Sequence, residues 1–323
     1  MYSKILVPLD GSKTAENVLP YARCFARSLQ VPVELMAVVD SVEMARNVSA
    51  AESLCSDTLI DDEIRRCGNY LQQVTNNFPV NGARCTVEKG KAADVIIESA
   101  AAQRKTLIAM ATHGRSGLNR WLLGSVAEKV LRGTSNPLLL VRAKQQTPPW
   151  EMAALKRVIV PLDGSELSER VLPYVEALAK HLDLEVTLFG VYGIPLVAGG
   201  TGEGFYNSDQ MDALIAGVRA ETVTYLAVKT EELKQKGFNK VSFKAKEGLV
   251  ADGIIAMARE TPDTLIAMCS HGRTGVKRWV LGSVTETVVR HSDNAVLVIP
   301  PGADFPHRKT NHLTQKGISY GSA

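Results

Sequence analysis

Two motifs each occur twice in the same order, and this internal duplication is the feature that most restricts the fold. The hexapeptide Val-Pro-Leu-Asp-Gly-Ser stands at residues 7–12 and again at residues 160–165. A longer segment, residues 113–126, begins His-Gly-Arg and ends Leu-Gly-Ser-Val, and it returns in closely similar form at residues 271–284. Two motifs that recur in one order indicate a duplicated domain, so fold and function have to be considered for each half.

The length of 323 residues suits two domains of about 150 residues, each with its own core. We place the first domain at residues 1–143 and the second at residues 156–300. Between them, residues 144–155 form a linker marked by Gln-Gln-Thr-Pro-Pro. Residues 301–323 have no hydrophobic periodicity and are expected to be a disordered tail.

Charge and hydropathy narrow the class of protein. A net charge of +3 does not point to a nucleic-acid partner or a polybasic membrane surface. No apolar run is long enough to span a bilayer, and a strand pattern that starts at Lys4 leaves no room for a cleavable signal peptide. The five cysteines contain no Cys-x-x-Cys pair, which favours thiols without metal or redox roles. We therefore expect a cytoplasmic protein that binds neither nucleic acid nor membrane.

Each half alternates short apolar runs with segments of helical periodicity, such as residues 15–29. Because the runs are apolar throughout, they indicate parallel sheets covered by helices on both faces. The expected fold class is therefore α/β, with two tandem doubly wound Rossmann-like domains. The strands expected in the first half are residues 5–7, 33–39, 83–87, 107–110 and 137–141. Those expected in the second half are residues 158–160, 186–191, 241–244, 265–268 and 295–299.

The longer motif places a helix start beside two glycines. A buried strand ends at Met110, and Gly124 and Ser125 open a helix that ends near Gly133. A helix N-terminus has unpaired N–H groups and a partial positive charge, so phosphate binds there readily. Gly114 and Gly124 allow a ligand to approach the backbone, and the hydroxyl of Ser125 can add a contact.

The same residues have a purely structural interpretation. Residues 125–128 and 283–286 follow the Ser-x-x-Glu pattern of a capping box, which alone justifies Ser125 and Ser283. A helix cap and a phosphate contact can share one residue, so both interpretations stay open at this point.

The shorter motif supplies a carboxylate to each half. Asp10 and Asp163 follow the first strand of their halves, and ligands of doubly wound sheets bind outside the carboxyl ends of the strands. A carboxylate there can accept hydrogen bonds from a ribose or base, or help to hold a metal bound to phosphates. Its alternative role is to cap the following helix, which Ser12 and Ser165 can also do.

With both motifs in place, the halves resemble the universal stress protein family over nearly the whole chain outside the linker and tail. The nucleotide-binding branch of that family has the signature Gly-x-x-Gly, nine residues, then Gly-Ser/Thr, and its later part matches residues 114–125 and 272–283. Ala111 and Cys269 replace the family's first glycine. Because a thiol is bulkier than a methyl group, we expect the first site to be the better one.

The resemblance implies one adenine-nucleotide crevice per half, with the aspartate near adenine and ribose and a valine of the second strand against adenine. It also implies five parallel strands in the order 3-2-1-4-5, with the last strands of the two halves paired in a pseudo-dimer, and a homodimer as a further option. The residues implied in the first half are Pro8, Asp10, Val38, Ala111, Gly114, Arg115, Gly124, Ser125 and Val126. Those implied in the second half are Pro161, Asp163, Val191, Cys269, Gly272, Arg273, Gly282, Ser283 and Val284.

No residue stands out as catalytic. His113 and His271 have no acid or nucleophile partner visible in the sequence and are expected to be turn residues or to support the site from behind. Arg115 and Arg273 suit phosphate neutralisation and surface loops equally well. The glycine-rich segment 193–204 lacks the ending of a Walker loop and is expected to be a surface loop.

Three functions are compatible with these residues: a nucleotide-binding regulator, a slow Mg²⁺-dependent ATPase, and a nucleotide-free interaction module. Nothing dedicated to hydrolysis is visible, which disfavours the ATPase. We predict a cytoplasmic stress-response regulator that binds ATP, ADP or AMP and is read by a protein partner. Whether Mg²⁺ accompanies the phosphates is left open.

Overall fold

The computed structural model describes residues 2–41, 56–76, 78, 83–113, 123–142, 148–193, 208–261, 263–272 and 281–303. The first half contains strands β1 (Lys4–Pro8), β2 (Val33–Val39), β3 (Arg84–Lys89), β4 (Thr106–Ala111) and β5 (Leu138–Val141). Its helices are α1 (Lys13–Glu16), α2 (Leu19–Leu29), α4 (Ser56–Asn76), α5 (Ala92–Ala101) and α6 (Ser125–Gly133).

The second half repeats this succession of elements. Its strands are β6 (Arg157–Pro161), β7 (Glu185–Tyr192), β8 (Val241–Glu247), β9 (Thr264–Cys269) and β10 (Ala295–Ile299). Its helices are α7 (Glu166–Glu169), α8 (Leu172–Leu182), α9 (Ser208–Gln235), α10 (Val250–Arg259) and α11 (Ser283–His291). The predicted α/β fold of two tandem Rossmann-like units is confirmed.

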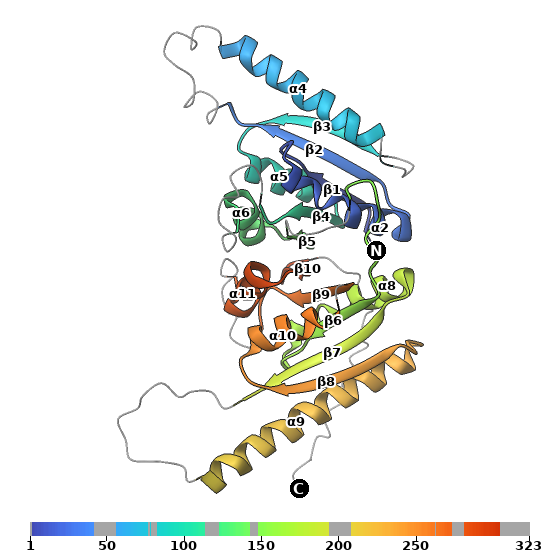
Figure 1. Cartoon of the computed structure of the whole chain (residues 1–323), viewed down its shortest axis with the longest axis vertical. Coiled ribbons are helices and arrows are strands. Elements are labelled where there is room, and N and C mark those ends of the chain that lie inside the picture. Colours follow the sequence, from blue (N-terminus) through green and yellow to red (C-terminus); the bar gives the residue numbers. More distant parts are fainter. Residues whose placement is uncertain are drawn as a thin grey trace, which may run out of the picture.

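All these strands form one ten-stranded sheet, in the order β3-β2-β1-β4-β5-β10-β9-β6-β7-β8 (Figure 1). Each half thus has the order 3-2-1-4-5, and its strands are parallel. The halves meet where β5 and β10 pair antiparallel, with Leu139 opposite Leu297. The last strands therefore join the two halves, as the resemblance implied.

The central strands of the sheet, such as β4, β5 and β10, are buried on both faces, which explains why they are mostly apolar. The edge strands β3 and β8 carry polar and exposed residues instead. Along β4, Leu107 and Ala109 contribute to the core on one face, while Ile108 and Met110 contribute to the core on the other. Helices α2, α4, α8 and α9 cover the first face through Phe25, Leu71, Tyr174 and Leu226. Helices α5, α6, α10 and α11 cover the opposite face through Ile96, Val130, Ile254 and Val288.

The helix expected over residues 15–29 is divided into α1 and α2. Pro20 stands at the second position of α2 and has no N–H to bond the carbonyl of Glu16, so a continuous helix is not possible there. Pro173 divides α7 from α8 in the same way. The repeat extends to the helix ends, because α2 and α8 both stop at a left-handed residue, Gln30 and Asp183.

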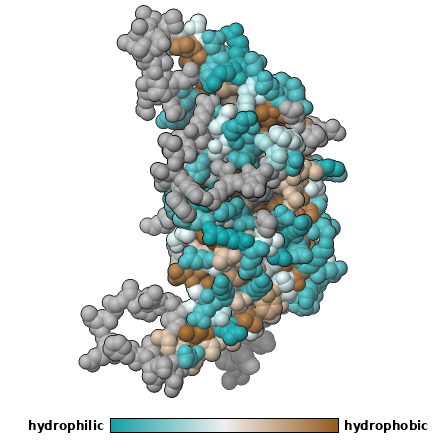
Figure 2. Space-filling view, viewed as in Figure 1, coloured by the Kyte–Doolittle hydropathy of each residue, from teal (hydrophilic) through white to brown (hydrophobic). Residues whose placement is uncertain are grey.

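The described part of the linker runs along the first half, where the N–H of Ala153 donates to the carbonyl of Pro20 at 3.0 Å. The face in Figure 2 is mostly hydrophilic, with apolar residues in small separate areas. Among the described helices, none has the length and apolar character needed to cross a membrane. The predicted tail beyond residue 303 and the glycine-rich loop 194–204 lie outside the described residues.

Candidate functional site

A cavity of about 630 Å³ lies at the carboxyl ends of the strands in the second half. Its position is the switch point of the sheet, where β6 and β9 are neighbours and the chain continues from them in opposite directions. The volume falls in the range of about 300–1,000 Å³ that is usual for small-molecule sites. The cavity therefore stands where a doubly wound sheet binds its ligand.

The carboxylate of Asp163 is held by the turn that follows β6. Its Oδ1 accepts hydrogen bonds from the N–H and the hydroxyl of Ser165, at 3.0 and 2.6 Å. The hydroxyl oxygen of Ser165 in turn accepts from the N–H of Ser168 at 3.1 Å and caps α7. Asp10 and Ser12 make the same pair of bonds, at 2.9 and 2.6 Å. The serines are thus the helix caps, and the aspartates hold the serines.

Two glycines bring the backbone close to this carboxylate and to the end of β9. A Cβ atom at Gly272 would overlap Asp163 Oδ2, so that oxygen faces Gly272 directly. The N–H of Gly282 donates to the carbonyl of Ser270 at 2.9 Å, and a Cβ there would lie 2.8 Å from the same oxygen. Contacts within the protein therefore favour glycine at both positions, whether or not a ligand is bound.

Helices α6 and α11 begin without a side-chain cap. Gly124 and Gly282 are the N-caps, and Ser125 and Ser283 are the first helical residues, so the predicted capping boxes are wrong. The reason is that a serine with helical backbone angles cannot direct its hydroxyl to the N–H two or three residues ahead. Both serines are exposed, and the first N–H groups of α11 have no partner among the described residues. A helix start with free donors thus borders the cavity.

The structure brings the predicted residues of the second half together. The cavity is lined by Pro161, Asp163, Val191, Cys269, Gly272, Gly282, Ser283 and Val284. Corresponding strand and helix ends of the first half carry Pro8, Asp10, Val38, Ala111, Gly124, Ser125 and Val126. Gly114, Arg115 and Arg273 lie outside the described residues.

Cys269 stands in the wall of the cavity without filling it. Its thiol donates to the carbonyl of Ser168 at 3.7 Å and is buried. Burial raises the pKa of this thiol to about 12, so it is protonated at neutral pH. A thiol at the position of the family's first glycine is therefore compatible with a cavity, and the expectation of a weaker second site stays a prediction.

The two motif histidines are neutral rings tied to the preceding residue. Nδ1 of His271 lies 2.9 Å from the hydroxyl of Ser270, and Nδ1 of His113 lies 3.0 Å from that of Thr112. Burial lowers the pKa of both imidazoles, and the charge of Arg142 lowers the pKa of His113 further. His271 also lines the cavity, so it offers a neutral ring to a ligand.

Sequence reasoning missed one wall of the cavity, which α9 supplies. Its residues there are Val218, Glu221, Thr222 and Tyr225. A signal existed in the duplication, because Tyr70 and Tyr225 each precede a fully buried leucine in corresponding helices. The described lining carries two carboxylates, Asp163 and Glu221, and no group of three His, Cys, Asp or Glu among the described residues is placed to hold a metal ion.

A tandem α/β fold with a switch-point cavity beside an open helix start defines a class of Rossmann-like ligand-binding protein. The model of the universal stress protein family matches residues 1–142 and 154–300, and the chain belongs to that family. A universal stress protein of Methanocaldococcus jannaschii is 28% identical over 144 residues, which is 45% of this chain and 81% of that protein.

A solved structure agrees with this fold. A universal stress protein from Archaeoglobus fulgidus aligns with a TM-score of 0.67 and 22% identity, over 94% of this chain and 100% of that chain. A universal stress protein solved in complex with cAMP aligns over 46% of this chain and 98% of that chain, with 20% identity and a TM-score of 0.32.

Proposed function

We propose that this chain is a cytoplasmic regulator of the stress response, which binds an adenine nucleotide at its switch-point crevices and presents the bound state to a protein partner. One observation carries the proposal. Every described residue that the resemblance implied for the second half lines a single cavity of about 630 Å³, although these residues come from segments more than 100 positions apart.

The lining suits the two ends of a nucleotide. The N–H groups at the start of α11 and the hydroxyl of Ser283 supply donors and a partial positive charge for phosphates. Pro161, Val191 and Val284 supply apolar contacts for a base. Asp163 Oδ2, beside Gly272, is an acceptor for ribose or base donors. Any Mg²⁺ would enter the cavity bound to the phosphates of the nucleotide.

A charge placed at the two helix starts tests the proposal. Aspartate in place of Ser125 or Ser283 is favourable for the helix, because it stands in the first turn, yet it repels a phosphate. We expect native mass spectrometry of the full chain with ATP and Mg²⁺ to show one nucleotide fewer in Ser125→Asp, one fewer in Ser283→Asp, and none in the double variant.

Calorimetric titration with ATP, ADP and AMP then measures affinity. In each variant the Kd of the altered site should rise tenfold or more, which corresponds to about 1.4 kcal/mol of binding free energy. Thermal unfolding is the control, since an acidic first turn should leave the midpoint unchanged or higher. A wild-type protein that stays without nucleotide after ATP and Mg²⁺ are supplied would refute the proposal, and so would unchanged binding in the double variant.

A further inference from the structure

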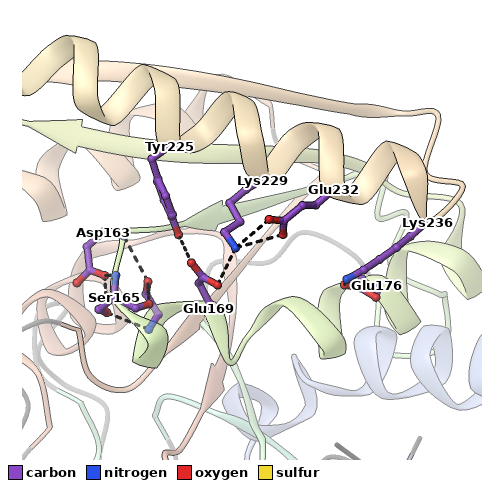
Figure 3. Close-up of polar contacts among 9 residues, drawn as sticks. Asp163, Ser165, Glu169, Glu176, Tyr225, Lys229, Glu232 and Lys236 are labelled. Carbon is purple, nitrogen blue, oxygen red and sulfur yellow. Dashed lines mark hydrogen bonds and ion pairs between the residues drawn. The ribbon is translucent and has the colours of Figure 1, made fainter. Parts of the chain in front are cut away.

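The helix α9 forms a wall of the second-half cavity that no motif marked. Tyr225 lies in this wall. Its side chain reaches from α9 toward the turn after β6, where α7 begins (Figure 3). The position of this ring therefore depends on what holds its hydroxyl and what holds the helix.

A chain of polar contacts holds the hydroxyl. Tyr225 donates to Glu169 Oε1 at 2.9 Å, and Lys229 Nζ lies 3.0 Å from Glu169 Oε2 (Figure 3). Lys229 also pairs with Glu232 at 3.2 Å and keeps only 18% of its side chain exposed. Glu169 belongs to α7, which starts at the serine that holds Asp163. The tyrosine is thus tied to the same turn that positions the aspartate.

Burial raises the pKa of Tyr225, and the nearby carboxylates of Glu169, Asp163 and Glu232 raise it further. The hydroxyl is therefore protonated throughout the physiological range and remains a donor to Glu169.

Helix α9 also packs closely against β7. A Cβ atom at Gly190 of β7 would lie 2.8 Å from Thr222 and 2.9 Å from Leu226, so α9 packs directly against the strand at a glycine. Further along α9, beyond its C-terminal end, Lys236 pairs with Glu176 of α8 (Figure 3). Polar contacts and close packing against β7 and α8 therefore hold this wall in place.

The first half shares only part of this arrangement. Tyr70 donates to Glu16 Oε1 at 3.2 Å, which corresponds to the bond between Tyr225 and Glu169. Val74 stands where the second half has Lys229, and Ala37 stands where it has Gly190. The ion pairs of Lys229 and the close packing of α9 against Gly190 are therefore features of the second half.

We infer that Tyr225 determines which ligands the second-half cavity accepts, because its ring forms the wall against which an aromatic base packs. The inference rests on the proposed function. An aromatic side chain offers a π-face to any base, and such packing contributes through the ring, not through the hydroxyl. Glu169 and Lys229 are positioning residues, since they fix the ring and do not line the cavity.

The test uses the full chain with Ser125→Asp, so that only the second site is read. In this background we expect Tyr225→Leu to weaken ATP and adenosine binding about tenfold, because the π-face is lost. Tyr225→Phe keeps the face and should stay within about threefold of the background. Inorganic tripolyphosphate, which has no base, should bind all three proteins equally, whereas a general distortion of the site would weaken it too.

Tyr70→Leu is the matched control, and it should leave second-half binding at the background value. Photolabelling with 8-azido-ATP provides a readout that needs no variant, and we expect the label on Tyr225. Absence of ATP binding in the background protein would contradict the proposed function at this site. ATP binding that Tyr225→Leu does not change, or a label found only on other residues, would overturn the role of Tyr225 alone.

Discussion

At the scale of single residues, the motif glycines serve packing before any ligand arrives. The sequence pattern presents Gly282 as a position where a ligand approaches the backbone. In the structure its N–H already bonds the carbonyl of Ser270, and the same carbonyl leaves no room for a Cβ. Asp163 shows a similar double use, because Oδ1 holds Ser165 while Oδ2 faces Gly272. A variant at such a position changes stability and binding together.

Gly282→Ala should therefore destabilise the fold, because the contact of 2.8 Å is to backbone, which cannot move aside as a flexible side chain would. We expect a loss of about 1–3 kcal/mol in the free energy of unfolding, measured by urea titration. Gly217→Ala is the control, since Gly217 is exposed on α9 with open space around it and should gain about 0.5–1 kcal/mol. If Gly282→Ala is as stable as the wild type, the backbone at Ser270 can move to make room for the added methyl group.

At the scale of secondary-structure elements, the short helices α1 and α7 connect the first strand of each half to the rest of the site. Each is a single turn, too short to be stable alone, and each starts at a serine whose hydroxyl both caps the helix and donates to the aspartate. In the second half α7 also carries Glu169, which holds Tyr225. One turn of helix thus positions two walls of the cavity.

Ser165→Ala removes this cap, and we expect it to cost about 1 kcal/mol in the free energy of unfolding. It should also lower nucleotide affinity at the second site, because Asp163 loses the 2.6 Å hydrogen bond that orients it. Ser12→Ala is the matched control, with a similar loss of stability and unchanged second-site affinity. Urea titration and calorimetry on both variants make the comparison. Equal second-site affinities in the two variants would show that Ser165 stabilises the fold without positioning Asp163 for the nucleotide.

At the scale of the whole molecule, the two halves are joined by a strand pair and by a charge cluster. Ion pairs connect the helices α6 and α11 across the junction, and the start of α11 borders the second-half cavity. Arg132 lies 3.3 Å from Glu286, Arg290 lies 3.6 Å from Glu128, and each arginine also pairs with the glutamate one turn before it. These four residues continue the junction that β5 and β10 form within the sheet.

Replacing both glutamates, Glu128→Gln with Glu286→Gln, should lower the free energy of unfolding by about 1 kcal/mol at low salt, because the pairs are only partly buried. The loss should shrink in 1 M salt, which screens such charges. Asp62→Asn removes an exposed pair with Arg65 and should change stability little under either condition. A loss for the double variant that salt does not reduce would assign the effect to packing instead of charge.

Much of the fold follows from patterns confined to short windows of sequence. The duplication, the apolar strands and the switch from strand to helix periodicity predicted two tandem α/β units, and the resemblance to a known family supplied the strand order. Part of the second-half cavity lining was also predictable, because Asp163, Gly272 and Ser283 sit in the two repeated motifs. One difference from the predicted elements also has a local cause, since Pro20 divides the helix expected over residues 15–29 into α1 and α2.

The remaining features arise from contacts between distant residues, which no local pattern contains. Ser125 and Ser283 look like caps in sequence, yet Gly124 and Gly282 are the N-caps and both helices begin at the serines. Tyr225 meets Glu169 across 56 positions, and β10 meets β5 across the two domains. The repeated domain and its motifs can be read from the amino-acid order, because periodicity and turn chemistry are local. The helix that lines the cavity and the way in which the halves join emerge from the folded chain, because both depend on contacts between side chains that are far apart in the sequence.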